Sequence, residues 1–183
     1  MRDLIVTQNI TLDGVIDATE GWFDVGDADQ TDVIAAIREQ SAAADAVLLG
    51  RVTFEEMRGF WPHQTDDPTG VTDYLNSVQK YVVSGTLDDP AWEPTTVLRG
   101  PLGYEIRSLK SQAGRDIVAT GSMTLVRDLI GEGLVDEYRL FVYPVVLGRG
   151  RRLFEDPAAA TRLRLVETRP FTSGIVLLRY RTH

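Results

Sequence analysis

Short apolar runs alternate along this chain with segments whose apolar residues recur every three or four positions. The runs are rich in β-branched residues, which favours buried strands at 4–6, 46–49, 80–84, 95–98 and 116–120. Helical spacing predicts helices between these strands, at 33–44, 51–58, 71–78, around 106–109 and at 125–130. Thr31 is expected to cap the first helix. Strands that alternate with helices are typical of an α/β fold.

The pattern changes after residue 136, where longer apolar strands follow one another without a helix. We expect these strands at 137–147, 163–166 and 175–180. Pro144 lies inside the first of them and predicts an edge position or a bulge, because proline cannot donate a ladder hydrogen bond. Pro170 and Gly174 predict an antiparallel hairpin between the other two. Residues 1–183 are therefore expected to form one α/β domain with a mixed, mostly parallel sheet and an antiparallel C-terminal hairpin.

Composition narrows the classes of function. The 183 residues fit one domain, and 43% hydrophobic with 25% charged residues is typical of a globular protein. The chain has no cysteine and two histidines, so no metal site is expected and a reducing, cytoplasmic location is favoured. No apolar run approaches the roughly 20 residues of a membrane helix, so no membrane association is expected.

Charge is distributed unevenly along the chain. The net charge is −8, but residues 139–183 contain nine arginines and three acidic residues. Because an acidic body repels the phosphate backbone, nucleic-acid binding is not expected. We interpret the arginine-rich tail as a solvated end of the sheet. A small phosphorylated ligand or a partner subunit is the alternative interpretation.

Three predicted strands end in small residues directly before a helix or a turn. These junctions are Gly50-Arg51, Ser84-Gly85 and Gly121-Ser122. In an open α/β sheet, ligands bind at the carboxyl ends of the strands, where helix N-termini offer free N–H groups to anions. Arg51 adds a permanent positive charge that suits a phosphate. Each junction alone is compatible with an ordinary turn, whereas three at one edge favour a phosphate-bearing ligand.

The polar segment 9–30 is long for a connection in a compact domain, and such loops are usually functional. Within it, Asp13 either caps a turn or faces a ligand. Four aromatic residues, Trp22, Phe23, Phe60 and Trp61, lie in loop-like segments. They either anchor those loops or line a pocket for a planar ring. No Ser-His-Asp arrangement supports a hydrolase.

Several segments resemble the dihydrofolate reductase superfamily, in the branch of the reductase domain of the bacterial bifunctional riboflavin-biosynthesis deaminase–reductase. They span nearly the whole chain in the expected order: 11–16 (TLDGVI), 48–55 (LLGRVTFE), 81–84 (YVVS), 121–125 (GSMTL), 134–137 (LVDE), 143–150 (YPVVLGRG) and 153–154 (LF). The last three segments, from 134 to 154, are the most specific to this family. A deaminase domain is not expected, because the chain has no cysteine for its zinc.

The resemblance implies a dihydrofolate reductase-like fold that binds NADPH and a small-molecule substrate. It implies a cofactor site built from strand-end and helix-start residues: Gly50, Arg51, Thr53, Ser84, Gly121, Ser122, Met123 and Leu125. Asp13 matches the aspartate of the family's Asp-Gly loop, beside the nicotinamide and the substrate, and is the catalytic candidate. Its carboxyl group would need a raised pKa to donate a proton. Related reductases also imply a homodimer through the C-terminal strands.

The chain departs from the family in two places. The first helix carries Ile34 where dihydrofolate reductases have an acid, with Asp32 nearby, and the segment 88–94 has no arginine for a substrate phosphate. The resemblance therefore implies an NADPH-dependent reductase of a small planar heterocycle, similar to 5-amino-6-(5-phosphoribosylamino)uracil reductase or dihydrofolate reductase. The alternative is a regulatory protein that binds NADP(H) or a nucleotide and has lost catalysis.

Overall fold

The structure, a computed structural model, describes residues 1–17, 21–24, 26, 28–155 and 162–183. Residues 18–20, 25 and 27 of the long predicted loop lie outside this description. The elements in chain order are β1 (Leu4–Thr11), α1 (Thr31–Ala43), β2 (Ala44–Gly50), α2 (Arg51–Phe60), the 3₁₀ turn η1 (Trp61–His63), α3 (Val71–Ser77), β3 (Gln79–Val83), β4 (Thr95–Leu98), α4 (Leu102–Ser111), β5 (Asp116–Gly121), α5 (Met123–Gly131), β6 (Glu137–Tyr143), β7 (Arg164–Pro170) and β8 (Val176–Arg181).

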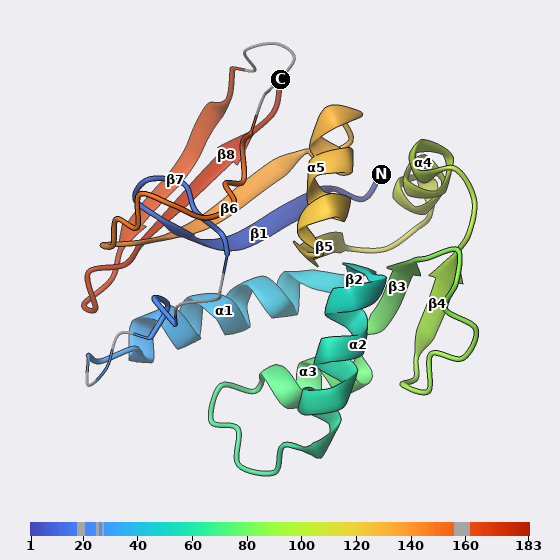
Figure 1. Cartoon of the computed structure of the whole chain (residues 1–183), viewed down its shortest axis with the longest axis horizontal. Coiled ribbons are helices and arrows are strands. Elements are labelled where there is room, and N and C mark those ends of the chain that lie inside the picture. The colour runs from blue at the N-terminus through green and yellow to red at the C-terminus, as the bar shows by residue number, and fades with distance from the viewer. Residues whose placement is uncertain (18–20, 25, 27, 156–161) are drawn as a thin grey trace.

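The described strands form one mixed sheet in the order β4-β3-β2-β5-β1-β6-β8-β7 (Figure 1). Strands β1 to β6 run parallel, whereas β8 is antiparallel to β6 and β7 is antiparallel to β8. The predicted α/β fold with an antiparallel C-terminal hairpin is therefore confirmed. The carboxyl ends of six parallel strands lie at one edge of the sheet, which places the predicted junctions on the same side of the molecule.

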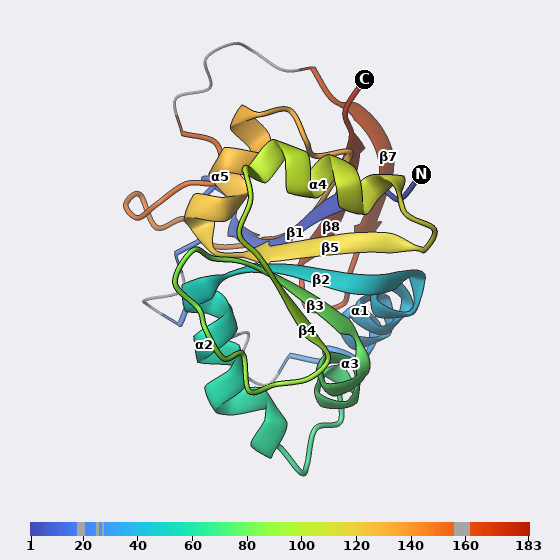
Figure 2. The same ribbon diagram turned by 90° about the vertical axis from the view of Figure 1, so that its right-hand side faces the viewer.

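Helices cover the sheet on both faces, so the domain has three layers (Figure 2). Alternate residues of β2 show the division, because successive side chains of a strand point to opposite faces. Ala46 and Leu48 belong to the core under α4 and α5, whereas Val47 and Leu49 pack with α2 and α3. A third apolar cluster lies under α1, against β6 and β8. No helix of the described residues is long and apolar enough to cross a membrane.

The ends of three strands differ from the prediction by four residues or more, and one of these is β7, which runs to Pro170 rather than 166. β1 continues through Thr11 rather than ending at Val6, because the polar residues that follow find partners within the fold. Gln8 donates from its side-chain nitrogen to the carbonyl oxygen of Thr120 at 3.0 Å. β6 ends at Tyr143 rather than 147, so Pro144 lies just beyond an interior strand and not at an edge. Its missing N–H then costs no ladder bond.

The first helix also differs at both of its ends. Thr31 already belongs to α1 and does not cap it, since the Asp29 carboxylate accepts the hydrogen bond from the Thr31 N–H at 2.9 Å. Ala44 has extended backbone angles and begins β2 instead of ending the helix. The hairpin between β7 and β8 is confirmed, with the Phe171 N–H donating to the Ile175 carbonyl at 2.8 Å and Gly174 at a positive φ of 84°. Only glycine adopts such a φ without strain.

Candidate functional site

The predicted junctions lie side by side at the carboxyl edge of the sheet. β3, β2, β5 and β1 are neighbours in this order, and they end next to Ser84, Gly50, Gly121 and Asp13 respectively. α2 begins directly after Gly50, and α5 begins directly after Ser122. The N-termini of two helices therefore lie at the ends of adjacent strands, where their free N–H groups favour an anion.

Gly50 and Gly121 allow these two helix starts to pack closely. A Cβ atom added at Gly50 would lie 3.0 Å from the backbone nitrogen of Ser122 and would overlap the hydroxyl oxygen of the same residue. A Cβ atom at Gly121 would lie 2.9 Å from Oγ1 of Thr53. The peptide bond between Gly121 and Ser122 is cis. The absence of side chains at both glycines is thus required for the local geometry.

The side chains at the two helix starts have different surroundings. Ser122 caps α5, its hydroxyl oxygen accepting from the Leu125 N–H at 3.4 Å. Leu125 is buried in the core under α5, with Met123 packed partly buried against the same core. α2 has no side-chain cap and no acidic residue in its first turn. Its N-terminal N–H groups are therefore the more open of the two sets.

Arg51 lies at the surface of the first turn of α2. Its side chain is 44% exposed and forms an ion pair with Glu55, 2.8 Å away and one turn further along the helix. An exposed pair of this kind is weak, so a phosphate competes with Glu55 for the guanidinium group. Arg51 can therefore turn to an anion bound at the helix N-terminus.

Ser84 is the third predicted contact, and its hydroxyl group already serves the loop after β3. The side chain is buried, and its oxygen accepts from the N–H groups of Thr86 at 3.1 Å and Leu87 at 3.0 Å. These are the bonds of a serine turn. The hydroxyl hydrogen can still donate to a ligand, because an oxygen that accepts twice keeps its own donor.

Asp13 connects the loop after β1 to the loop after β6. Its carboxylate accepts from the Thr11 hydroxyl at 2.6 Å, from the Gly148 N–H at 2.8 Å and from the Leu147 N–H at 3.3 Å. These bonds hold the pKa of the Asp13 carboxyl at about 2, with the Thr11 hydroxyl as the largest cause. In this structure the donors stabilise the charged form, which is the opposite of the shift that proton donation by Asp13 requires.

A cavity of about 520 Å³ opens on the face of the sheet covered by α1, α2 and α3. Three of the four aromatic residues predicted for a substrate pocket line it: Trp22, Phe23 and Trp61. The fourth, Phe60, is 53% exposed and packs edge-on to Trp61 instead of lining the cavity. We call it the aromatic cavity. Trp22 packs edge-on to Phe23 with ring centroids 5.9 Å apart, and its indole N–H donates to the Asp17 carbonyl at 2.6 Å. Its orientation at the cavity wall is therefore fixed.

The polar groups of the aromatic cavity are neutral. Among the described residues that line it, none carries a charged side chain. Thr7 donates to the side-chain oxygen of Gln40 at 3.3 Å, and the side-chain nitrogen of Gln40 is buried without a hydrogen-bond partner. Asp32 is turned away from the cavity, since its carboxylate accepts from the N–H and the hydroxyl of Thr172 at 2.8 and 2.9 Å. No acid on α1 thus reaches this cavity within the described part of the chain.

The α3 side of the aromatic cavity was not identified from the sequence. Val71, Tyr74 and Leu75 line it, together with Met57 of α2. The spacing of Val71, Tyr74 and Leu75 predicts the apolar face of a helix, but not that this face borders a cavity, which depends on how α1 and α3 pack on the sheet.

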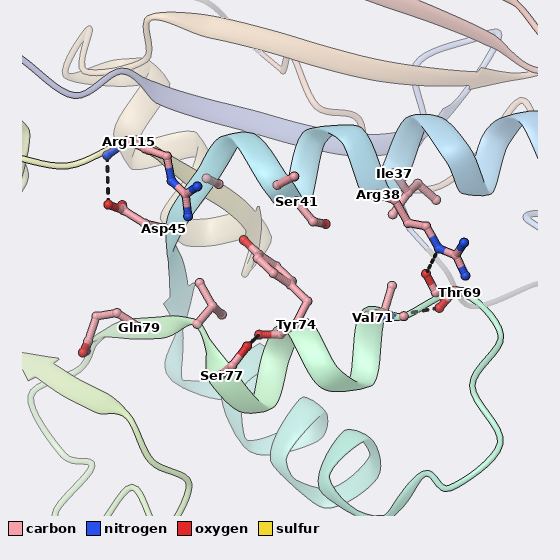
Figure 3. Close-up of a pocket in the computed structure, with 14 residues that line it drawn as sticks. Ile37, Arg38, Ser41, Asp45, Thr69, Val71, Tyr74, Ser77, Gln79 and Arg115 are labelled. Carbon is pink, nitrogen blue, oxygen red and sulfur yellow. Dashed lines mark hydrogen bonds between the residues drawn. The ribbon is translucent and has the colours of Figure 1, made fainter.

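A second, more polar cavity of about 510 Å³ adjoins the first between α1 and α3 (Figure 3). Ile37, Ser41, Val71 and Tyr74 line both cavities. Burial raises the pKa of the Tyr74 hydroxyl to about 12, so this group is neutral and able to donate.

The charged groups of this polar cavity lie around Tyr74 and along α1. Asp45 accepts from the backbone N–H of Arg115 at 2.9 Å and forms an ion pair with Arg2, whereas Arg38 donates to the Thr69 carbonyl at 2.8 Å. With Asp45 already paired, the side chains of Arg38 and Arg115 leave the cavity with an excess of positive charge.

The chain matches the RibD C-terminal domain model over residues 2–177. It is 34% identical to the uncharacterized protein YyaP of Bacillus subtilis (strain 168) over 188 residues, which cover 98% of this chain and 94% of YyaP.

Solved structures show the same fold. A proposed riboflavin biosynthesis protein from Shewanella sp. PV-4 superimposes with a TM-score of 0.74 at 19% identity, over 99% of both chains. Dihydrofolate reductase from Enterococcus faecalis, solved in complex with NADP(H), superimposes with a TM-score of 0.65 at 16% identity, over 99% of this chain and 96% of the reductase. The fold is therefore dihydrofolate reductase-like, and the chain belongs to the RibD C-terminal domain family, a family of NADPH-dependent reductases.

Proposed function

We propose that the protein is an NADPH-dependent reductase of a small planar heterocycle. The main support for this proposal is that the aromatic cavity lies directly beside the strand ends that contain Gly50 and Gly121. Thr120 lines the aromatic cavity, and the next residue, Gly121, begins the crowded turn before α5. A dinucleotide bound along the strand ends can thus reach the cavity with its reactive end.

The residues at the strand ends fit a dinucleotide phosphate. Gly50 and Gly121 leave room for close backbone approach, and the N-terminus of α2 has no side-chain cap to compete with an anion. Arg51 and Thr53 lie in that first turn, with Ser84 on the adjacent strand end. NADPH, once bound, would supply the hydride.

The aromatic cavity would hold the substrate ring. Trp22, Phe23 and Trp61 offer flat apolar surfaces, and the neutral amides of Gln8 and Gln40 offer hydrogen bonds to carbonyl or ring-nitrogen groups. A neutral wall favours an uncharged ring over a protonated one, because a buried cation needs a partner. Folate-like reduction, which depends on an acid at the ring, is therefore not proposed.

The proton that accompanies the hydride would come from water. Asp13 is ionised at neutral pH because its pKa is about 2, so it does not serve as the proton donor. We propose instead that Asp13 shapes the site by joining the loops on either side of it.

The polar cavity would accept a substituent of the substrate ring. It continues from the aromatic cavity past Tyr74, and Arg38 and Arg115 give it an excess of positive charge. An anionic or strongly polar arm on the ring therefore fits this cleft better than a second apolar group.

The test is a screen of NADPH oxidation at 340 nm against pterins, ribityl pyrimidines and simple carbonyl compounds. A hit among neutral rings with an anionic arm supports the proposal. Titration calorimetry with NADPH is run in parallel, and an absence of NADPH binding contradicts it.

The second candidate is an NADP(H)-binding regulatory protein without catalysis. The absence of a charged group among the described residues of the aromatic cavity favours it, since no carboxyl or imidazole group there can protonate a substrate. NADPH binding by calorimetry together with no turnover across the whole screen would favour this candidate.

A further inference from the structure

Lys80 is a completely buried lysine. It belongs neither to the strand-end residues of the candidate site nor to the residues that line the two cavities. It lies on β3 between Val47 of β2 and Thr95 of β4, and its side chain has no exposed surface. Its ammonium group donates to the carbonyl oxygens of Leu75 at 2.8 Å and Val78 at 2.9 Å. A buried lysine is retained only with such partners, because an unpaired charge in the interior is strongly unfavourable.

These two acceptors lie at the C-terminal end of α3. The last carbonyl groups of a helix have no partner within the helix, and a positive charge there interacts favourably with the helix dipole. α3 has only seven residues, which is too short for a helix that is stable by itself. At its N-terminal end the Asp67 carboxylate already accepts from the Thr72 N–H at 2.7 Å, so it is the C-terminal carbonyl groups that need a further partner. The ammonium group of Lys80 therefore supplies a cap on which the position of α3 depends.

The Trp92 ring holds the ammonium group from the other side. The Nζ atom lies 4.7 Å from the centre of the ring, and the indole N–H donates to Asn76 of α3 at 2.9 Å. Trp92 in turn packs against Phe54 of α2, with ring centroids 5.8 Å apart. Lys80 thus connects α3 to the core under α2 through a cation–π contact.

The same turn of α3 forms one wall of the aromatic cavity. The carbonyl of Leu75 accepts from Lys80 while its side chain lines the cavity, and the carbonyl of Tyr74 accepts from the Val78 N–H at 2.8 Å. Tyr74 also borders the polar cavity. A change at the Lys80 ammonium is therefore transmitted to the cavity wall through one peptide unit.

We propose that Lys80 is a positioning residue for the substrate, acting through the C-terminal turn of α3 to hold Tyr74 and Leu75 at the cavity wall. The role in substrate binding rests on the proposed function of the aromatic cavity, whereas the effect on α3 does not.

The position of α3 then depends on pH. Burial lowers the pKa of Lys80 to about 8, and the Glu93 carboxylate, the charged group that acts on it from a neighbouring segment, opposes this shift. Below pH 8 the charged form makes two charge-assisted hydrogen bonds, and above it the neutral amine makes weaker ones. The C-terminal turn of α3 therefore loosens, and the substrate KM rises, as the pH increases through about 8.

The test compares Lys80→Met with Lys110→Met, which removes the only other lysine of the chain. Lys110 donates to the Leu134 carbonyl and pairs with Asp136, away from the cavities. In Lys80→Met we expect amide hydrogen exchange at residues 74–78 to accelerate by about 10-fold or more, as for a lost charged hydrogen bond. With a substrate from the screen, KM rises by a similar factor, kcat changes by a few-fold at most and the Kd of NADPH is unchanged. Lys110→Met leaves exchange at 74–78 as in the wild type.

A wild-type measurement keeps the proposal testable if Lys80→Met does not fold. Nitrogen-15 labelling of lysine gives two side-chain signals, and the Lys80 signal should titrate together with the exchange rates at 74–78, corrected for intrinsic pH dependence. Unchanged exchange at 74–78, in the variant or across this titration, overturns the proposal. Accelerated exchange together with a negative substrate screen supports the effect of Lys80 on α3 and removes the proposed reductase function.

Discussion

The Asp13 carboxylate accepts a hydrogen bond from the Gly148 N–H at 2.8 Å, and this contact ties the loop after β1 to the loop after β6. Backbone hydrogen bonds continue the connection, from the Ile16 N–H to the Arg151 carbonyl at 2.9 Å and from the Leu153 N–H to the Gly14 carbonyl at 3.1 Å. Ile16 lines the aromatic cavity. The two loops therefore act as one unit that carries part of the cavity wall.

Asp13→Asn should loosen this unit without removing a proton donor. Both carboxylate oxygens accept hydrogen bonds, so an amide places an N–H against at least one donor. We expect a lower Tm at pH 7, a raised substrate KM and no change in the pH dependence of kcat near neutrality. If Asp13→Asn instead removed an ionisation from the pH profile of kcat and left KM unchanged, Asp13 would be a catalytic residue.

The stability difference between wild type and Asp13→Asn should depend on pH. The folded-state pKa of Asp13 is about 2, below the ordinary aspartate value of 3.8. Its contribution to stability is therefore complete above pH 4 and is lost as the pH falls through the range from 3.8 to 2. Thermal melts at pH 2 to 7 check this. Asp66→Asn, at an exposed position in the connection before α3, serves as the control with the same change of charge.

Gly50→Ala should disturb the contact between α2 and α5. The new methyl group would meet the backbone and the hydroxyl group of Ser122, and crowding against backbone costs about 1–3 kcal/mol. NADPH binding should weaken because both helix N-termini shift. Gly59→Ala, in the same helix with open space around it, should instead stabilise by about 0.5–1 kcal/mol. Chemical denaturation measures the free energy of unfolding of both variants. Equal changes in Gly50→Ala and Gly59→Ala would contradict the close contact between α2 and α5.

Arg51→Ala should reduce the preference for NADPH over NADH. The loss of a charge-assisted bond to the extra phosphate corresponds to about 10-fold weaker NADPH binding, with little effect on NADH. Glu55→Gln should strengthen NADPH binding by a few-fold, because it releases Arg51 from the ion pair. Calorimetry with both cofactors measures this, and equal losses for NADPH and NADH would exclude Arg51 from the phosphate site.

The protein should form a homodimer through its C-terminal hairpin, β7 and β8. β7 is an edge strand of the described sheet, and Leu165 and Val166 on it are 50% and 41% exposed. Light scattering should give twice the chain mass of 20.3 kDa. Leu165→Glu should return the mass to that of one chain, whereas Tyr104→Glu, on the exposed surface of α4, should leave the dimer intact. A wild-type mass of one chain would refute this prediction.

The glycine junctions could be predicted from the sequence because each depends on a few consecutive residues at the end of an apolar run. The aromatic cavity could be predicted only in part. Trp22 and Trp61 stand out as aromatic residues in loops, but Tyr74 and Leu75 read as an ordinary helix face. The polar end of β1 was missed for a similar reason, since the partner of Gln8 is a carbonyl group more than a hundred residues away.

The direct succession of α1 and β2 sets how the two walls of the cavity are attached. α1 ends at Ala43 and β2 begins at Ala44, so the C-terminal end of α1 is held directly by the sheet. α3 is attached at both ends by basic side chains: Arg38 of α1 donates to the Thr69 carbonyl just before it, and Lys80 of β3 donates to the Leu75 carbonyl near its end. The width of the cleft between α1 and α3 is therefore set by two cations, one at each end of the shorter helix.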